Sequence, residues 1–158
     1  MIVKPIDACG GSGVFHVRAD DRNTNAILET VTSCCASLVM AQKYLPESRK
    51  GDKRILLLDG EPIGAVLRVP RADETRANLH VGGRPEHAPL DDWDRELCKR
   101  VGERCRADGL YFVGLDVIGG WLTEVNVTSP TGVQEIERLE GPGLAKRIAE
   151  WLLTKSAS

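Results

Sequence analysis

The sequence contains no run of apolar residues that approaches the roughly 18 required for a membrane span. Its first ten residues lack the basic start and the apolar stretch of a secretion signal. Lysines and arginines are spread along the chain, and the formal net charge is only -2. Because a nucleic-acid-binding protein usually concentrates its basic residues on one surface, this distribution disfavours that class. We therefore expect neither a membrane nor a nucleic acid as a partner.

Several kinds of cysteine and histidine site are also missing. The five cysteines are odd in number, and no two of them form a Cys-x-x-Cys pair. This pattern disfavours a disulfide framework and a zinc site. It favours reduced thiols and a cytoplasmic location. The three histidines are scattered and suggest no catalytic dyad, so a hydrolase is not predicted.

The composition is that of a globular domain. The 158 residues are 42% hydrophobic and 28% charged, which suffices for one hydrophobic core. The segment Ile2–Pro5 reads as the end of a strand that runs directly into a loop. We therefore expect the chain to begin partway through a larger protein.

Strand and helix patterns alternate along the sequence. Asp59-Gly60 and Gly119-Gly120 mark two hairpins, and Asp91 or Asp92 is placed to cap the central helix. The predicted strands are 14–17, 39–45, 54–58, 63–69, 110–117 and 122–127, and the predicted helices are 25–37, 90–107 and 143–153. These elements predict an α+β fold, with an antiparallel sheet and helices packed on one face.

The segment 70–89 stands apart from these elements. It holds three arginines, two adjacent glycines and few large apolar residues. We therefore expect a long loop here, which at this length inside a compact domain is usually functional or disordered.

The second hairpin carries a set of oxygen-bearing side chains. Glu124 and Asn126 face the same way, because side chains alternate along a strand. A three-residue turn would place Asp116 opposite Glu124, whereas a two-residue turn at Gly119-Gly120 would place it on the wrong face. In the first case Asp116, Glu124 and Asn126 predict a magnesium site that phosphates and water complete. In the second, they form an ordinary solvated hairpin face.

The glycine-rich segment Cys9–Gly13 is a candidate phosphate loop, because consecutive backbone amides can surround a phosphate. It is not a P-loop, since no Gly-Lys-Ser/Thr follows. Lys4 precedes it on the strand and could reach the same phosphate. An ordinary turn beside a surface lysine explains the same residues, so both interpretations stay open.

Four arginines are candidates for binding anions. Arg54 and Arg68 lie on facing strands of the first hairpin, while Arg76 and Arg84 lie in the long loop. Guanidinium groups match carboxylate and phosphate oxygens in pairs. If they converge, they suit an anionic substrate or a transferred phosphoryl group. Taken singly, each is more often an ordinary surface residue.

Short motifs occur in order along nearly the whole chain. The most specific are the arginine-containing loop and the Asn-Val-Thr-Ser-Pro-Thr run that begins at Asn126. Together they resemble glutathione synthetase of the bacterial kind, a member of the ATP-grasp superfamily. The matching segments are residues 3–7 with 10–11, 41–46, 51–54, 59–62, 74–79, 82–84, 112–116 and 122–130.

The resemblance implies a role for most of the residues above. Residues near the nucleotide would be Lys4, Gly10, Gly11, Gln42, Lys43, Tyr44, Leu45 and Asp52, with 42–45 as the hinge that meets adenine. The ligands of Mg²⁺, or of Mn²⁺, would be Asp116, Glu124 and Asn126. The catalytic residues would be Arg54, Arg68 and Arg76, and the peptide site would use Arg68, Arg76, Arg84, Ser129 and Thr131.

The implied reaction is an ATP-driven ligation. ATP phosphorylates the C-terminal carboxylate of γ-glutamylcysteine, and the amine of glycine then attacks the acyl phosphate to give glutathione. Residues 71–84 would form a lid that keeps water from this intermediate. Two departures from the family pattern are Cys9, where glycine is usual, and residues 71–73, which lack the usual paired glycines.

The resemblance also implies that part of the enzyme is missing. Family members are longer, so residues 1–158 would be a partial ATP-grasp domain without the N-terminal substrate domain or the first half of the ATP-grasp module. We expect little ligase activity from the isolated chain. A homo-oligomer or a complementing N-terminal chain would be its protein partner. The alternatives are a non-catalytic nucleotide-binding or assembly module and another ATP-grasp carboxylate-amine ligase.

Overall fold

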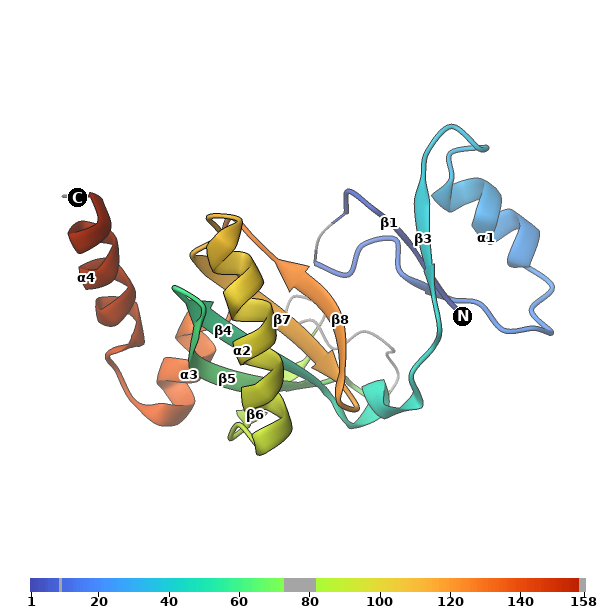
Figure 1. Ribbon diagram of the computed structural model, residues 1–158. Helices are drawn as coiled ribbons and strands as arrows, with labels where there is room; N and C mark the ends of the chain where they lie inside the picture. Colours follow the sequence, from blue (N-terminus) through green and yellow to red (C-terminus); the bar gives the residue numbers. More distant parts are fainter. Residues whose placement is uncertain (9, 73–81, 157–158) are drawn as a thin grey trace.

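The computed structural model describes residues 1–8, 10–72 and 82–156, which form two lobes joined by a single linker (Figure 1). The small lobe comprises residues 1–42, the linker residues 43–51, and the large lobe the described residues from 52 onward. The elements are β1 (Ile2–Pro5), β2 (Phe15–His16), α1 (Thr24–Val31), β3 (Val39–Gln42), the 3-10 helix η1 (Pro46–Lys50), β4 (Asp52–Leu58), β5 (Glu61–Val69), β6 (Arg84–His87), α2 (Asp92–Ala107), β7 (Phe112–Ile118), β8 (Trp121–Asn126), α3 (Val133–Glu140) and α4 (Leu144–Ser156).

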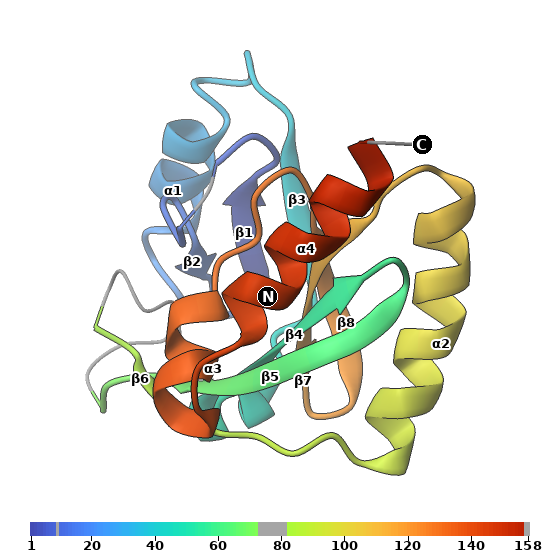
Figure 2. The same ribbon diagram turned by 90° about the vertical axis from the view of Figure 1, so that its left-hand side faces the viewer.

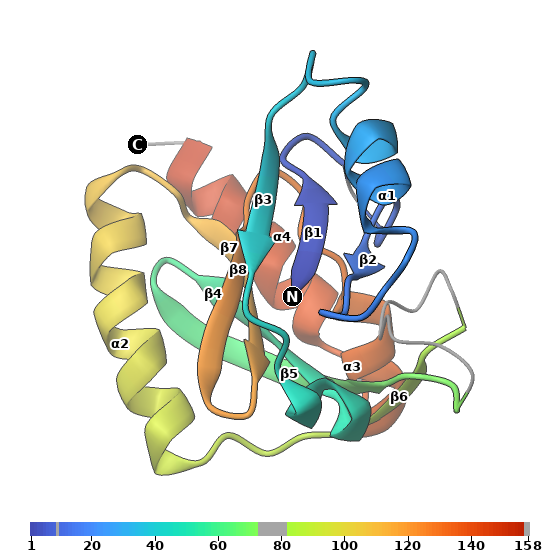
Figure 3. The same cartoon turned by 90° about the vertical axis from the view of Figure 1, so that its right-hand side faces the viewer.

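The small lobe is a three-stranded antiparallel sheet with one helix. Strand β1 lies between β2 and β3, and α1 covers one face of the sheet (Figure 3). Val3, Val17 and Val31 are its buried apolar residues. Because side chains alternate along β1, burying Val3 against α1 turns Lys4 toward the other face.

The large lobe is built on a five-stranded antiparallel sheet in the order β6-β5-β4-β7-β8. Its central strand β4 is apolar on both faces. Ile55 and Leu57 pack against α2, and Leu56 packs with Ile136 and Leu144 of α3 and α4. Figures 1 and 2 show α2 on one side of the sheet and α3 with α4 on the other.

The predicted α+β class with antiparallel pairing is confirmed. Helices cover both faces of the larger sheet, however, because α3, a helix that the sequence analysis did not predict, carries Ile136 into the second face. The segment 70–89 is not loop throughout, since β6 pairs with the end of β5. Among the described residues, no helix is both long and apolar enough to span a membrane.

Local side-chain and backbone features set the start of α2 and the end of α1. Asp91 caps α2, forming a reciprocal capping box with Asp94. The helix predicted over 25–37 stops at Val31. Residues 33–35 have φ values of 49°, 53° and 69°, in the left-handed region that a right-handed helix excludes. Trp93 in the first turn of α2 is exposed and donates its indole N–H to the carbonyl oxygen of Gly120.

Helix α2 approaches the β4–β5 turn closely at one glycine. A Cβ atom on Gly102 would lie 2.1 Å from the carbonyl oxygen of Gly60. At an unconstrained helix position, glycine to alanine stabilises by about 1 kcal/mol. Here the added methyl group must push the helix off the turn.

We predict that Gly102→Ala lowers the free energy of unfolding by about 1–3 kcal/mol, because overpacking of this kind costs that much. The measurement is urea unfolding of both proteins. Glu103→Ala, an exposed neighbour on the same helix, should change the stability by less than about 0.5 kcal/mol. A Gly102→Ala protein more stable than the parent would show that the contact does not constrain the helix.

Candidate functional site

A cleft of about 840 Å³ lies between the two lobes. The small lobe contributes β1 and the glycine-rich segment after it, and the linker contributes residues 43–45 and Ser48. The large lobe contributes the polar end of its sheet together with residues 129–135, which lead into α3. Side chains from both lobes therefore face one shared space.

One face of the large sheet supplies most of the charged residues of that wall. Asp52 pairs with Arg68, and Arg54 with Asp116, in the antiparallel register. Because side chains two residues apart share a face, these four project to the same side as Leu56. At the apolar end this face is covered by α3 and α4, and at the polar end it opens to the cleft.

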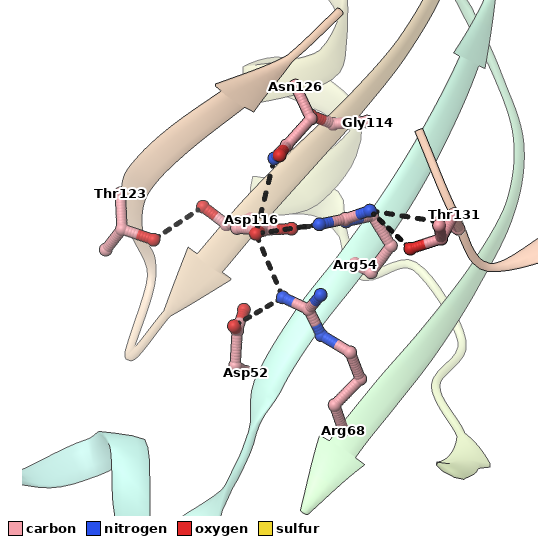
Figure 4. Close-up of polar contacts among 8 residues, drawn as sticks. All are labelled: Asp52, Arg54, Arg68, Gly114, Asp116, Thr123, Asn126 and Thr131. Atoms are coloured by element: carbon pink, nitrogen blue, oxygen red, sulfur yellow. Dashed lines mark hydrogen bonds and ion pairs between the residues drawn. The ribbon is translucent and has the colours of Figure 1, made fainter. Parts of the chain in front are cut away.

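The Asp116 carboxylate is the centre of this polar end (Figure 4). It is 3% exposed, and its Oδ1 accepts a hydrogen bond from Nε of Arg54. Its Oδ2 accepts bonds of 2.9 Å from Nη2 of Arg54, 2.9 Å from Nη2 of Arg68 and 3.3 Å from Nδ2 of Asn126. Nη2 of Arg68 also donates to Oδ2 of Asp52. Two carboxylates and two guanidinium groups thus form one buried network.

The pKa values of the groups in this network shift in different directions. Burial and the charge of Asp116 raise the pKa of Asp52 to about 7, although Arg68 and Arg54 oppose this. Burial alone would also raise the pKa of Asp116, but hydrogen bonds from Arg54 and the charges of both arginines outweigh it and lower that pKa. Burial opposes the charge of Arg68, but the two carboxylates raise its pKa above the usual value. Near neutral pH, Asp52 is therefore the carboxyl group that changes charge.

Asp116, Glu124 and Asn126 come together, but not through the three-residue turn that the sequence analysis required for this. The hairpin has the two-residue turn Gly119-Gly120, with both φ values positive. A β-bulge then inserts Thr123 as an extra residue, and this shift places Asp116 opposite Glu124. The Thr123 hydroxyl donates 3.0 Å to the carbonyl oxygen of Asp116.

These three side chains fit a magnesium ion that takes the rest of its coordination from phosphate or water oxygens. They line the cleft on one sheet face and offer two carboxylates and one amide oxygen, the hard donors that Mg²⁺ selects. Among the described residues, no group of three histidine, cysteine or carboxylate side chains is placed to hold a metal. A cation there would therefore need further oxygens from water or phosphate.

The small lobe and linker bring most of the predicted nucleotide residues to the cleft. Lys4, Gly10 and Gly11 line it, as do residues 42–45 of the predicted hinge. The side-chain nitrogen Nε2 of Gln42 donates to the carbonyl oxygen of Thr123 at 3.5 Å, so the hinge touches the large lobe. Cys9, in the same glycine-rich segment, lies outside the described residues.

His16 and Ser48 are among the residues of this wall that the sequence did not single out. His16 stacks on Tyr44 with ring centroids 3.8 Å apart, and both line the cleft. Partial burial lowers the pKa of His16, and the positive chain terminus and Arg18 add to the effect. Ser48, the second missed residue, turns its side chain inward from η1. No local motif marks either residue, because their positions depend on the linker folding back over β2.

The cleft wall holds buried polar atoms that have no partner within the described part of the chain. They are the Tyr44 hydroxyl, Oγ of Ser48, Oδ1 of Asp52 and Nε of Arg68. Buried polar groups are rarely left unpaired, and an unpaired group costs about 1–3 kcal/mol. Their shared location indicates a surface shaped for a polar ligand.

The predicted peptide-site residues divide into three groups. Ser129 and Thr131 line the cleft, and Thr131 also accepts bonds of 3.0 Å and 3.4 Å from Nη1 of Arg54, at its carbonyl and hydroxyl oxygens. Arg84 is exposed, pairs with Glu86, and is not among the residues that line the cleft. Arg76 and most of the predicted lid lie outside the described residues.

Over residues 1–141 the sequence matches the family described as prokaryotic glutathione synthetase, ATP-grasp domain. The chain belongs to this family. Among curated proteins it is 55% identical over 152 residues to the glutathione synthetase of Gloeobacter violaceus, a match that covers 96% of this chain and 47% of that protein. It is 51% identical over 153 residues to that of Thermosynechococcus vestitus, covering 97% and 48%. The chain thus spans about half the length of these relatives.

Solved structures show the same fold at lower sequence identity. The ATP-grasp ligase PsnB complexed with a precursor peptide and AMPPNP aligns with a TM-score of 0.66 and 19% identity, covering 99% of this chain and 46% of that chain. The same ligase with a minimal precursor, Mg and ADP aligns with a TM-score of 0.63 and 21% identity, covering 96% and 45%. The ATP-grasp fold expected from the sequence is confirmed.

The raised pKa of Asp52 leads to a pH-dependent stability. A carboxyl group whose pKa is higher in the folded state favours folding at low pH and loses that contribution as the pH rises through the folded value. We predict that the free energy of unfolding of the parent falls relative to that of Asp52→Asn between about pH 5 and pH 8. One pKa unit corresponds to about 1.4 kcal/mol, so the difference should exceed about 1 kcal/mol.

Urea unfolding at several pH values measures this difference. Asp7→Asn, a change at an exposed carboxylate, is the matched control and should follow the parent at every pH. Parallel curves for the parent and Asp52→Asn would show that Asp52 titrates as an ordinary carboxyl group.

Proposed function

We propose that this chain supplies the ATP- and metal-binding part of an enzyme that joins glycine to γ-glutamylcysteine through an acyl phosphate. It would act as a partial ATP-grasp domain spanning residues 1–158. The observation that carries the proposal is the Asp116 network, which faces the glycine-rich segment of the small lobe across one cleft. Membership of the glutathione synthetase family supports the choice of substrates in this proposal.

Each wall of the cleft has a distinct task in this proposal. Lys4 and the amides around Gly10 and Gly11 neutralise and hold the phosphates of ATP. The hinge residues 42–45 contact adenine, and Tyr44 and Ser48 offer their unpaired hydroxyls to the nucleotide. The orphaned Oδ1 of Asp52 is a further acceptor on the same wall.

Asp116, Glu124 and Asn126 would hold Mg²⁺ or Mn²⁺, which when bound would offset the negative charge of the phosphates. Arg54 and Arg68 provide positive charge on the same sheet face, where the transferred phosphoryl group and the peptide carboxylate would lie. Ser129 and Thr131 border the peptide. Arg76 and Arg84 would join them if the segment 71–84 closes over the cleft.

The chemistry has two steps. A carboxylate oxygen of γ-glutamylcysteine attacks the terminal phosphorus of ATP, and ADP leaves. The amine nitrogen of glycine then attacks the acyl carbon, the carbon–oxygen bond to phosphate breaks, and the amine loses a proton. The acyl phosphate hydrolyses if water reaches it, so a closing lid would protect the product yield.

The proposal also covers the segments that this chain lacks and its location in the cell. The N-terminal substrate domain and the first half of the ATP-grasp module would come from a longer chain, a complementing chain or a homo-oligomer. Turnover would need these further segments as well, so the isolated chain should make little glutathione. A cytoplasmic location agrees with the free thiols of Cys34, Cys35, Cys98 and Cys105.

A chimeric enzyme tests the proposed function. This chain would replace the matching half of the Gloeobacter violaceus glutathione synthetase, with which it is 55% identical. We predict that the chimera forms glutathione from γ-glutamylcysteine, glycine and ATP. Asp116→Asn should lower kcat/KM by about 100-fold or more, since even residues that merely orient metal ligands contribute about 10–100-fold.

Asp20→Asn, at an exposed carboxylate of the small lobe, is the matched control and should retain the activity of the chimera. A folded chimera that binds ATP but makes no glutathione would instead favour the non-catalytic nucleotide-binding alternative. Product formation with a different amine or carboxylate, but not with glycine, would favour another ligase.

The same chimera tests the role of Lys4. Hydrogen bonds to charged groups contribute about 1.5–3 kcal/mol, so Lys4→Met should raise the KM for ATP by about 10-fold or more. Lys50→Met, an exposed change at the end of η1, should leave it within about twofold of the parent. An unchanged KM for ATP in Lys4→Met would remove Lys4 from the phosphate site.

A further inference from the structure

Arg54 and Arg68 bind the same carboxylate in different ways. Arg54 uses two nitrogens, Nε and Nη2, on the two oxygens of Asp116, and its third nitrogen donates to Thr131. All of its nitrogen atoms therefore have acceptors. This paired arrangement is the strongest that a guanidinium group makes with a carboxylate.

The guanidinium group of Arg68 is less completely hydrogen-bonded than that of Arg54. Its Nη2 is shared between Oδ2 of Asp116 and Oδ2 of Asp52, while its Nε is buried without a partner. Oδ1 of Asp52 is likewise buried and unpaired. Oδ2 of Asp116 receives three donors, although an oxygen of this kind has two lone pairs. Removing Arg68 from Asp116 would therefore leave that carboxylate still paired with Arg54.

We propose that Arg68 is an exchangeable arginine that leaves Asp116 for an anion in the cleft when a divalent cation binds Asp116, while Arg54 stays in place. The proposal rests on the function inferred above, since the anion would be the phosphoryl group or the peptide carboxylate. Arg68 lines the cleft, so the anion and the carboxylate compete for one guanidinium group.

The electrostatics give this exchange a direction. A cation at Asp116 repels the adjacent guanidinium group, and an anion in the cleft attracts it. Each ligand therefore favours the state that the other binds, which makes their binding cooperative. Without an anion, Asp52 and Asp116 hold Arg68 over the cation site. Arg68 thereby acts as a positioning residue that couples the two ligands.

The test measures binding of Mn²⁺ by electron paramagnetic resonance, with and without sulfate as the anion, at about pH 8 and constant ionic strength. In the parent chain, sulfate should increase the affinity for Mn²⁺ by about fivefold or more, the lower end of typical coupling. In Arg68→Gln, Mn²⁺ alone should bind more tightly than in the parent, and sulfate should no longer increase its affinity. Arg68→Lys should restore part of the coupling.

A double variant separates this exchange from a general charge effect. Asp52→Asn with Arg68→Gln removes one charge of each sign, so the net charge is unchanged. It also avoids leaving Asp52 buried beside an absent partner. We expect it to bind Mn²⁺ more tightly than the parent and to show no response to sulfate. Arg49→Gln, which removes an exposed cation of η1, should keep the sulfate response of the parent.

Two outcomes would overturn the proposal, and they are distinguishable. If Mn²⁺ binds the parent and Asp116→Asn equally weakly, both the metal site and the exchange are wrong. If Mn²⁺ binding depends on Asp116 but sulfate does not strengthen it, or if Arg49→Gln matches Arg68→Gln, only the exchange is wrong.

Discussion

The buried carboxylate of Asp116 constrains the polar end of the large sheet. A carboxylate removed from water is costly unless charged partners and hydrogen bonds surround it. Its partners here come from three other strands of the sheet: Arg54 from β4, Arg68 from β5 and Asn126 from β8. A one-residue slip of any of these strands would move its partner to the opposite face. The charges therefore specify the strand register in the part of the sheet that has no apolar cover.

The same sheet face changes character along its length. Leu56 and Val66 meet the apolar residues of α3 and α4. Arg54 and Arg68, each two residues nearer the cleft on the same strands, are charged and line it. Small residues make room for this transition. A Cβ atom on Gly114 would lie 3.1 Å from Cδ of Arg54 and 2.8 Å from Cβ of Pro130. The guanidinium group of Arg54 reaches Asp116 because nothing larger than glycine lies beneath its side chain.

The sequence predicts much of this arrangement, and its failures have physical causes. The hairpins at Asp59-Gly60 and Gly119-Gly120 are correct, since both turns need positive φ values. Helix α3 was missed because its eight residues have no side-chain cap and depend on packing of Ile136. The bulge at Thr123, which decides whether Asp116 meets Glu124, is a tertiary feature with no local signal. The stacking of His16 on Tyr44 likewise joins segments that the sequence separates.

The linker between the lobes has a thermodynamic consequence. Each lobe has its own apolar core, and among the described residues of the small lobe the buried apolar side chains are Val3, Val17 and Val31. Proteins open regionally, and regions with few buried apolar contacts open at the lowest free energy. In the unliganded chain, amide hydrogens of β1 should therefore exchange with solvent before those of β4. A ligand that contacts both lobes stabilises the folded small lobe by its binding free energy. The two lobes should then unfold together in one cooperative transition.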